Sequence, residues 1–370
     1  MSKFTTLYAN YGQSLWLDYI DRDLLVNGGL RELVSVGVRG VTSNPTIFHK
    51  AISEGGLYDE TIRDLIQADP EVDPQTLYQW LTVQDVQMAA DILAELYRSS
   101  DRADGFVSLE VSPHLAHDTQ GTIEAARHLW KMVERPNLMI KVPATRAGIP
   151  AVETLIGEGI NVNVTLLFST ARYEEVMDAY LRGLARNPDP HSVASVASFF
   201  ISRVDGMVDE ALAELDGPEA ASLRGRIAIA NARLAYSFFK ERFSGADFAQ
   251  QRKRRARVQR PLWASTSTKN PDYRDVLYVE SLIGPDTVNT LPPATLDAFQ
   301  GHGEMRATLE QDGGQAEKDL QALAELGIDL AQVTEELERD GIAKFADSYD
   351  ALLALLDQKR FEVSKEYARG

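Results

Sequence analysis

Residues 138–144 read Leu-Met-Ile-Lys-Val-Pro-Ala, an apolar run typical of a buried β-strand except for one lysine, Lys141. Successive side chains of a strand point to opposite faces, so Leu138, Ile140 and Val142 share one face and the lysine points from the other. Burial disfavours the charged form of an amine, and a neutral lysine is a nucleophile toward a carbonyl carbon. The alternative is a structural lysine that pairs with a buried carboxylate or reaches solvent at the strand end. The rest of the chain must decide between these two interpretations.

Seven further segments have the character of buried strands, and helical patterns separate most of them. The strand segments are residues 15–20, 37–45, 106–113, 160–167, 193–203, 261–266 and 286–291. About eight strand-then-helix units in one chain predict a (β/α)8 barrel, whose site is built at the carboxyl ends of the strands. An open doubly wound sheet is the second interpretation, but no Gly-x-Gly-x-x-Gly or Gly-x-x-x-x-Gly-Lys loop follows any strand.

The length and the end of the chain favour one domain. The 370 residues, 44% of them hydrophobic, are enough for a single barrel with extra helices. From residue 296 onward the pattern is helical, for example at Leu320, Leu323 and Leu326. We therefore expect residues 1–370 to form one barrel domain, with residues 296–370 as α-helices that cover it.

Composition excludes several classes of partner and chemistry. A net charge of −17 disfavours nucleic acid and anionic membranes as partners. The basic run at residues 252–257 is expected to be a solvated helix end or a loop before the next strand. The absence of cysteine excludes disulfides, thiolate catalysis and Cys-ligated metals. No apolar stretch has transmembrane length and the first residues lack a secretory signal, so we expect a cytoplasmic location. The choice between a monomer and a homodimer stays open.

The same alternation predicts a polar interior at the carboxyl ends of the strands. The outer face of each barrel strand should be apolar, and this expectation places Leu109 and Leu166 outward. The inward set is then Asp18, Asn44, Glu110, Lys141, Asn163 and Thr165. Structural alternatives exist, because Asn44 before Pro45 could cap a helix, Asp18 could pair with Lys141, and the others could be satisfied core groups. Their clustering by parity near strand ends favours a functional site.

These residue types permit carbon–carbon bond chemistry without a metal or a cofactor. A lysine condenses with a ketone to an imine, and the protonated imine accepts electrons when the adjacent bond breaks. Asp18 and Glu110 are available for the accompanying proton transfers. Asparagine and threonine both donate and accept hydrogen bonds, which suits a polyol. Ser198 and Arg203 after the sixth strand, and Lys269 after the seventh, are candidate phosphate ligands.

Four stretches of the chain resemble the transaldolases. They are residues 41–46 (VTSNPT), 138–144 (LMIKVPA), 159–169 (GINVNVTLLFS) and 198–203 (SFFISR), and the likeness runs from about residue 15 to residue 292. The resemblance implies a barrel enzyme of the pentose phosphate pathway with phosphorylated sugar substrates. Such an enzyme moves a dihydroxyacetone unit from sedoheptulose 7-phosphate to glyceraldehyde 3-phosphate, giving erythrose 4-phosphate and fructose 6-phosphate.

The resemblance also implies roles for individual residues. Lys141 would form the Schiff base, Asp18 would take the C4 hydroxyl proton, and Glu110 with Thr165 would manage the catalytic water. The implied substrate-binding residues are Asn44 and Asn163 for the dihydroxyacetone hydroxyls, Phe200 as a pocket wall, and Ser198, Arg203 and Lys269 for phosphate. Many transaldolases have arginine where Lys269 stands here. The length of the C-terminal helical region suggests the longer bacterial type of transaldolase. The chain is too short for the type that is fused to a sugar-phosphate isomerase.

Two other functions fit the same residues. An aldolase of the same superfamily, of the fructose 6-phosphate type, would release free dihydroxyacetone instead of transferring it. A barrel that only binds sugar phosphates would form no covalent adduct on Lys141.

Overall fold

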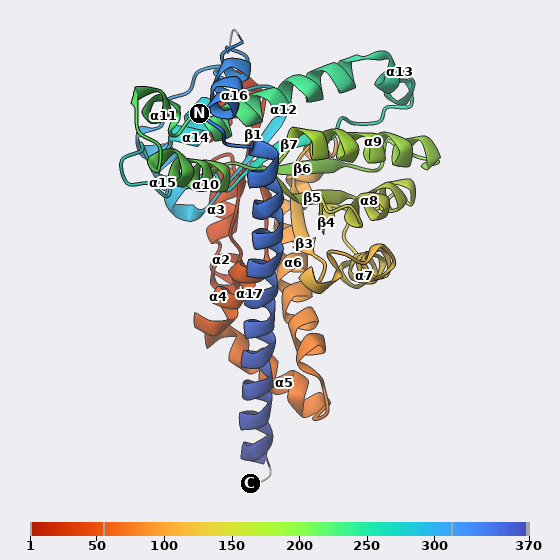
Figure 1. The fold of residues 1–370 in the computed structure, drawn as a ribbon. Coiled ribbons are helices and arrows are strands. Elements are labelled where there is room, and N and C mark those ends of the chain that lie inside the picture. The colour runs from red at the N-terminus through yellow and green to blue at the C-terminus, as the bar shows by residue number, and fades with distance from the viewer. Residues whose placement is uncertain (1, 55, 312–313, 368–370) are drawn as a thin grey trace.

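The structure is a computed structural model that describes residues 2–54, 56–311 and 314–367. Within these residues, eight parallel strands close into a barrel in which each strand pairs with the next along the chain and β8 pairs with β1 (Figure 1). The strands are β1 (Gln13–Leu17), β2 (Gly40–Val41), β3 (Phe106–Glu110), β4 (Leu138–Pro143), β5 (Val162–Leu167), β6 (Ser195–Phe200), β7 (Arg260–Ala264) and β8 (Thr287–Leu291). The predicted (β/α)8 barrel with additional C-terminal helices is confirmed.

Helices follow or precede every strand. They are α1 (Lys3–Tyr11), α2 (Arg22–Val26), α3 (Gly29–Ser35), α4 (Pro45–Glu54), α5 (Asp59–Ala68), α6 (Pro74–Ser99), α7 (Thr119–Val133), α8 (Gly148–Gly157), α9 (Thr170–Arg186), α10 (Ser202–Ala213), α11 (Pro218–Leu223), α12 (Ile227–Ser244), α13 (Ala246–Lys253), α14 (Leu277–Ser281), α15 (Pro293–His302), α16 (Gln315–Glu325) and α17 (Leu330–Tyr367). Two short 3₁₀ helices, η1 (Gly56–Tyr58) and η2 (Pro113–Leu115), complete the described elements.

The strands overlap all eight predicted segments, but β1 begins two residues before residue 15. Gln13 and Ser14 look unsuited to a buried strand, yet both are fully buried because their side chains have partners. Gln13 Nε2 donates to Leu282 O at 2.7 Å, and Ser14 Oγ donates to Asp104 at 2.7 Å. These hydrogen bonds offset the cost of burying the Gln13 NH₂ group and the Ser14 hydroxyl, although Gln13 Oε1 is buried without a partner among the described residues.

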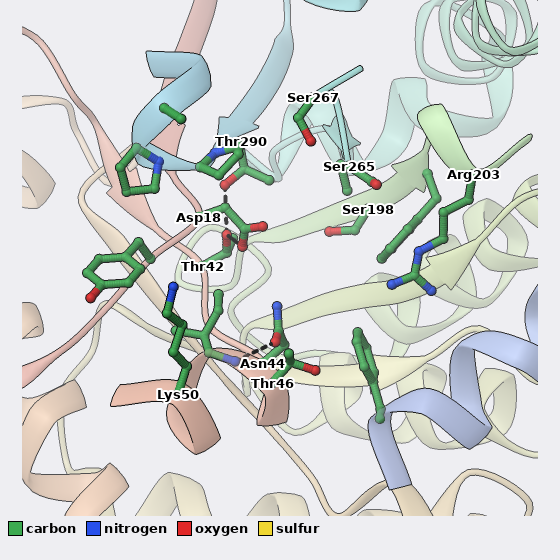
Figure 2. A pocket seen from close by; sticks show the side chains of 18 of the residues that line it. Asp18, Thr42, Asn44, Thr46, Lys50, Ser198, Arg203, Ser265, Ser267 and Thr290 are labelled. Carbon is green, nitrogen blue, oxygen red and sulfur yellow. Dashed lines mark hydrogen bonds between the residues drawn. The ribbon is translucent and has the colours of Figure 1, made fainter. Parts of the chain in front are cut away.

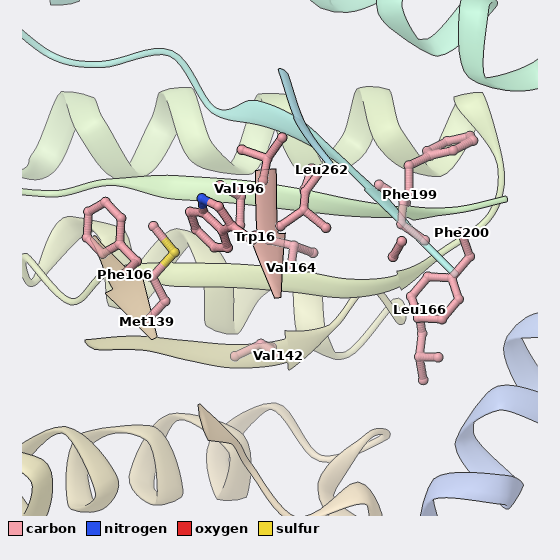
Figure 3. Packing of buried hydrophobic residues seen from close by; sticks show 14 of the residues in the cluster. Trp16, Phe106, Met139, Val142, Val164, Leu166, Val196, Phe199, Phe200 and Leu262 are labelled. Atoms are coloured by element: carbon pink, nitrogen blue, oxygen red, sulfur yellow. The ribbon is translucent and has the colours of Figure 1, made fainter. Parts of the chain in front are cut away.

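An apolar plug fills the barrel below the carboxyl ends of its strands. Trp16, Met139, Val196 and Leu262 lie on the inward face, each two residues before Asp18, Lys141, Ser198 and Ala264 respectively. Figure 3 shows Trp16, Met139 and Val196 gathered between the strands. A methyl group on Gly40 would lie 2.6 Å from the Trp16 ring, so the neighbouring strand needs a glycine there. Polar inward residues lie beyond this plug, at the carboxyl end.

Strict alternation does not hold at Leu166, for which the sequence predicts an outward position. The register of β5 against β6 shifts between Val164 and Leu167, and Leu166 has a left-handed φ of 54°. Such a bulge inserts an extra residue and re-aims the side chains around it. A methyl group on Gly341 of α17 would lie 2.8 Å from Leu166 Cδ2, so this side chain meets the last helix.

Among the described residues after 296, the chain is helical, as predicted, apart from the connections between α15 and α16 and between α16 and α17. α16 packs on α12, and the 38-residue α17 packs on α4, α5, α6 and α10 and touches β5. In Figure 1 α17 runs past the barrel and extends beyond it beside α5. Among the described residues, none of the helices has the length and apolar character needed to cross a membrane.

The basic run at residues 252–257 lies where the sequence predicts. α13 ends at Lys253, and the remaining residues form the loop before β7. Arg254 donates to the backbone carbonyls of Leu184 and Asn187, and Arg257 donates to that of Asp101. The run therefore ties neighbouring loops together at the amino end of the barrel.

Candidate active site

A cavity of about 530 Å³ opens at the carboxyl end of the barrel (Figure 2). Seven of the ten predicted site residues line it: Asp18, Asn44, Lys141, Ser198, Phe200, Arg203 and Lys269. The other three, Glu110, Asn163 and Thr165, are at most 4% exposed and belong to the adjoining strands β3 and β5. The structure thus brings together residues that lie on or just after the strands β1 to β7, including Arg203 at the start of α10.

Lys141 lies inside the barrel with its side chain only 5% exposed. Its Nζ donates to Ser43 O at 3.1 Å and lies 3.4 Å from Glu110 Oε2. β3 and β4 are paired so that Glu110 stands beside Lys141 in register, which explains the contact. The amine is therefore both buried and directed into the cavity, the two properties that a Schiff-base lysine needs.

Asp18 is held by hydroxyl groups and not by Lys141. Its carboxylate accepts a hydrogen bond from Thr42 Oγ1 at 2.6 Å, and Thr42 is in turn 2.7 Å from Thr290 Oγ1 (Figure 2). Burial raises the pKa of Asp18, against the opposing effects of Lys141, Thr42 and Arg203. The structural alternative of a direct Asp18–Lys141 pair is not what the structure shows.

Glu110 is a second buried carboxyl group. Burial also raises the pKa of Glu110, while the positive charge of Lys141 acts in the other direction. Among the side chains that the structure describes, both Glu110 carboxylate oxygens and the Thr165 hydroxyl are buried without a hydrogen-bond partner. These atoms keep hydrogen-bonding capacity, and Glu110 keeps it 3.4 Å from the lysine amine. Within the same described residues, no group of three or more His, Cys, Asp or Glu side chains could hold a metal ion.

Two asparagines are fixed by neighbouring groups. Asn163 Nδ2 donates to Ser108 Oγ at 3.0 Å, and its Oδ1 accepts from Ser198 Oγ at 2.6 Å. Asn44 Oδ1 accepts from Ile47 N at 3.0 Å, so Asn44 caps α4 and also lines the cavity. The capping alternative is correct for Asn44, and the cap leaves its NH₂ group available to the cavity.

Arg203 and Lys269 are the predicted cationic groups of the cavity, and Lys50, which the sequence analysis does not single out, also lines it beside Asn44 (Figure 2). The Arg203 guanidinium carbon is 5.2 Å from the centre of the Phe200 ring and 5.8 Å from that of Phe345. Burial lowers the pKa of Arg203, opposed by the charges of Asp18 and Glu110. Lys269 Nζ donates to Ser267 Oγ at 3.1 Å in an exposed position. Of these two groups, Arg203 is the one that packing holds in place.

Sequence reasoning missed several lining residues. Thr42, Thr290, Ser265 and Ser267 all end or follow strands, and that position could have identified them. Phe345 carries no such signal, because it belongs to α17, a helix distant in sequence from every strand.

A closed barrel with a buried lysine beside two buried carboxyl groups at its carboxyl end defines the class of Schiff-base aldolase barrels. The family model described as transaldolase/fructose-6-phosphate aldolase matches residues 15–356. The chain belongs to this family.

Relatives of similar length support the assignment. The chain is 49% identical over 352 residues to transaldolase 1 of Streptomyces coelicolor, an alignment that covers 94% of this chain and 92% of the relative. It is 48% identical over 348 residues to a transaldolase of Mycolicibacterium smegmatis, which covers 92% and 93% respectively. A transaldolase of Mycobacterium tuberculosis is 48% identical over 349 residues, with the same coverage of both chains.

Proposed function

We propose that this protein transfers a dihydroxyacetone unit from sedoheptulose 7-phosphate to glyceraldehyde 3-phosphate through a Schiff base on Lys141. The products are erythrose 4-phosphate and fructose 6-phosphate, and the reaction belongs to the pentose phosphate pathway. The observation that carries the proposal is the buried amine of Lys141 on the wall of the cavity, 3.4 Å from Glu110. Relatives that are 47–49% identical over most of the chain carry the name transaldolase.

The proposed reaction begins when the Lys141 amine attacks the ketone carbon of the donor. Loss of water gives an iminium ion, and Asp18 then takes the proton of the C4 hydroxyl while the C3–C4 bond breaks. The electron pair of that bond passes to the iminium nitrogen, so the aldehyde product leaves and an enamine stays on Lys141. The enamine carbon attacks the acceptor aldehyde, and the steps run in reverse to release the new ketose.

The proton-transfer roles of Asp18, Glu110 and Thr165 are supported by their burial. A carboxyl group whose pKa is raised by burial exchanges its proton nearer to neutral pH than an exposed one does. We assign Glu110 and Thr165 to the water that leaves and re-enters at the iminium carbon, because Glu110 lies 3.4 Å from the amine and both residues have buried oxygen atoms without a hydrogen-bond partner among the described residues.

Substrate recognition is assigned to groups of two kinds. Asn44 and Asn163 hold the hydroxyls of the dihydroxyacetone unit, and the Ser198 hydroxyl links Asn163 to the cavity. Ser198, Arg203 and Lys269 bind phosphate, and the Phe200 ring lies 5.2 Å from the guanidinium carbon of Arg203 as part of the wall. Arginine's planar fork matches two phosphate oxygens, so Arg203 contributes more than Lys269.

The second candidate is the fructose 6-phosphate type of aldolase, because the matching family model describes both activities. Both share the Schiff base and differ in what takes the enamine. An assay with donor alone, acceptor alone and both together separates them. We expect transfer to exceed release of free dihydroxyacetone, and release in excess of transfer would favour the aldolase.

Three broader features complete the proposal. Residues 1–370 form one barrel domain with covering C-terminal helices, the enzyme works in the cytoplasm, and it assembles as a monomer or a homodimer. Light scattering on purified protein measures the assembly directly.

A further inference from the structure

The last helix contributes an aromatic side chain to the cavity. Phe345, in the middle of α17, is 4% exposed and lines the same cavity as Lys141. The centre of its ring is 5.8 Å from Lys141 Nζ and 5.8 Å from the guanidinium carbon of Arg203. In Figure 2 the blue ribbon of the chain's last helix lies at the edge of the pocket on the side of Arg203.

Contacts on both sides of Phe345 fix the position of this helix. Gly341 lies one turn before Phe345 on the same face, and a methyl group there would lie 2.8 Å from Leu166 Cδ2 and 3.4 Å from Arg203 Nη1. One turn after Phe345, Ser348 Oγ is 2.8 Å from Thr46 Oγ1 of α4, and the Tyr349 ring packs 5.1 Å from that of Tyr78 in α6. α17 is therefore anchored to the barrel at the point where Phe345 enters the cavity.

Phe345 and Phe200 both lie close to the guanidinium group of Arg203. Both ring centres lie within 6 Å of its guanidinium carbon, a distance at which an aromatic face attracts a cation. Among the described residues, Arg203 forms no ion pair with a carboxylate, so the rings and not a counter-ion orient it. An arginine held this way keeps its donors for an anionic ligand.

We propose that Phe345 is a positioning residue that favours a phosphorylated aldehyde over water at the enamine of Lys141. This inference rests on the proposed function. The ring acts through Arg203, which it holds toward the phosphate of the acceptor, and it shields the Lys141 adduct from solvent. Release of free dihydroxyacetone needs a proton on the enamine carbon, addition of water to the resulting iminium carbon, and cleavage of the C–N bond to return the amine. Shielding slows this competing route.

Two substitutions separate the two effects of the ring. Phe345→Ala removes both the stacking and the shielding, and we expect the KM for glyceraldehyde 3-phosphate and the ratio of release to transfer each to rise about tenfold. Phe345→Leu keeps apolar volume without a ring, so the KM should still rise, while the ratio measured at saturating acceptor stays near that of the wild type. Phe361→Ala, which removes a 59% exposed ring from the same helix, is the matched control and should change neither value.

Several outcomes would overturn the inference. One is a folded Phe345→Ala variant with an unchanged KM for glyceraldehyde 3-phosphate and an unchanged ratio of release to transfer. Another is a KM for unphosphorylated glyceraldehyde that rises as much as the KM for glyceraldehyde 3-phosphate, because glyceraldehyde has no phosphate for Arg203. If Phe345→Ala does not fold, an unchanged KM for glyceraldehyde 3-phosphate in Phe345→Leu would also overturn the inference. The proposed function is checked separately by borohydride trapping of the wild-type adduct, so failure of the one is distinguishable from failure of the other.

Discussion

The two ends of the barrel each bury carboxyl groups, and they treat them in opposite ways. At the amino end Asp104 is fully buried and accepts hydrogen bonds from Arg39 Nε at 2.7 Å and Arg260 Nη2 at 2.9 Å. Ser14 and Trp16 donate to the same carboxylate. Burial alone would raise the pKa of Asp104, but Arg260 and Arg39 outweigh it and bring the pKa below its usual value.

At the carboxyl end the balance is reversed. Burial raises the pKa of both Asp18 and Glu110, although Lys141 and Arg203 act in the other direction. The apolar plug around Trp16 and Met139 separates the two regions. A buried carboxylate that is matched by two guanidinium groups acts as a fixed structural anion, whereas one that burial destabilises can exchange its proton. The two ends of the barrel therefore differ in how their buried carboxyl groups are compensated, and the cavity with Lys141 lies at the end where compensation is incomplete.

Lys141→Ala tests the reactive end most severely. Removal of a covalent nucleophile costs other enzymes about a million-fold in kcat, and we expect a loss of that order here. Circular dichroism and thermal unfolding should show an intact fold, because Glu110 can take up a proton once its counter-ion is gone. Substantial residual transfer by the folded variant would remove Lys141 from its proposed role.

Asp18→Asn should damage turnover but not the fold. Loss of a general base lowers kcat by about a hundred- to ten-thousand-fold. The amide can still accept the hydrogen bond of Thr42 and carries no charge to desolvate, so the free energy of unfolding should stay within about 1 kcal/mol of the wild type or rise. A kcat near that of the wild type would assign the proton transfer elsewhere.

Asp104→Asn is the matched substitution at the amino end of the barrel. In contrast to Asp18→Asn, it should lower the stability of the fold and leave turnover unchanged. It leaves Arg39 and Arg260 without their shared counter-ion, which should lower the free energy of unfolding by about 3–5 kcal/mol. The kcat per folded molecule should be unchanged, because the plug separates this cluster from the cavity. Urea denaturation and active-site titration measure the two quantities. Selective loss of kcat with full stability would contradict the division between the ends.

Arg203→Ala should have a smaller and more selective effect. Charge-assisted hydrogen bonds to phosphate are worth enough that we expect a rise of about 10- to 100-fold in KM for phosphorylated acceptors. The exposed Lys269 should matter less, so Lys269→Ala should raise KM by about threefold or less. Equal losses on unphosphorylated glyceraldehyde would argue against a phosphate contact by Arg203.

The smallest effect concerns the pH dependence of stability. The lowered pKa of Asp104 stabilises the fold above the usual aspartate range, and this contribution is lost as pH falls through the folded-state pKa. For Asp18 the raised pKa means that the folded state holds the proton longer, so stability falls as pH rises from the usual aspartate range through the raised value. Asp104→Asn should therefore be least destabilising at low pH, and Asp18→Asn most favourable at high pH. Denaturation of both variants from about pH 2 to about pH 8 spans the ranges below and above the usual aspartate pKa, and parallel pH dependences of the two variants would contradict the difference between the ends.

The sequence predicts the barrel and the position of Lys141 because a period of two assigns faces within each strand. The same rule places Glu110 inward, and strand pairing then brings it to Lys141. Alternation fails at Leu166, where a bulge interrupts the period. Patterns within one element also cannot reveal partners across the chain.

Long-range partners account for what the sequence does not predict. Asp104 meets Arg39 and Arg260 across 65 and 156 residues. Phe345 reaches the cavity from a helix whose own periodicity says only which face is buried. These contacts depend on how barrel closure and the last helix place distant segments together.

The central claim is a covalent bond between Lys141 and a sugar ketone at the carboxyl end of the barrel. The most direct measurement is borohydride reduction in the presence of fructose 6-phosphate, followed by mass spectrometry of the digested protein. We predict one reduced dihydroxyacetone adduct, located on Lys141 and abolished in Lys141→Ala. No adduct, or an adduct on another lysine that persists in Lys141→Ala, would contradict the account.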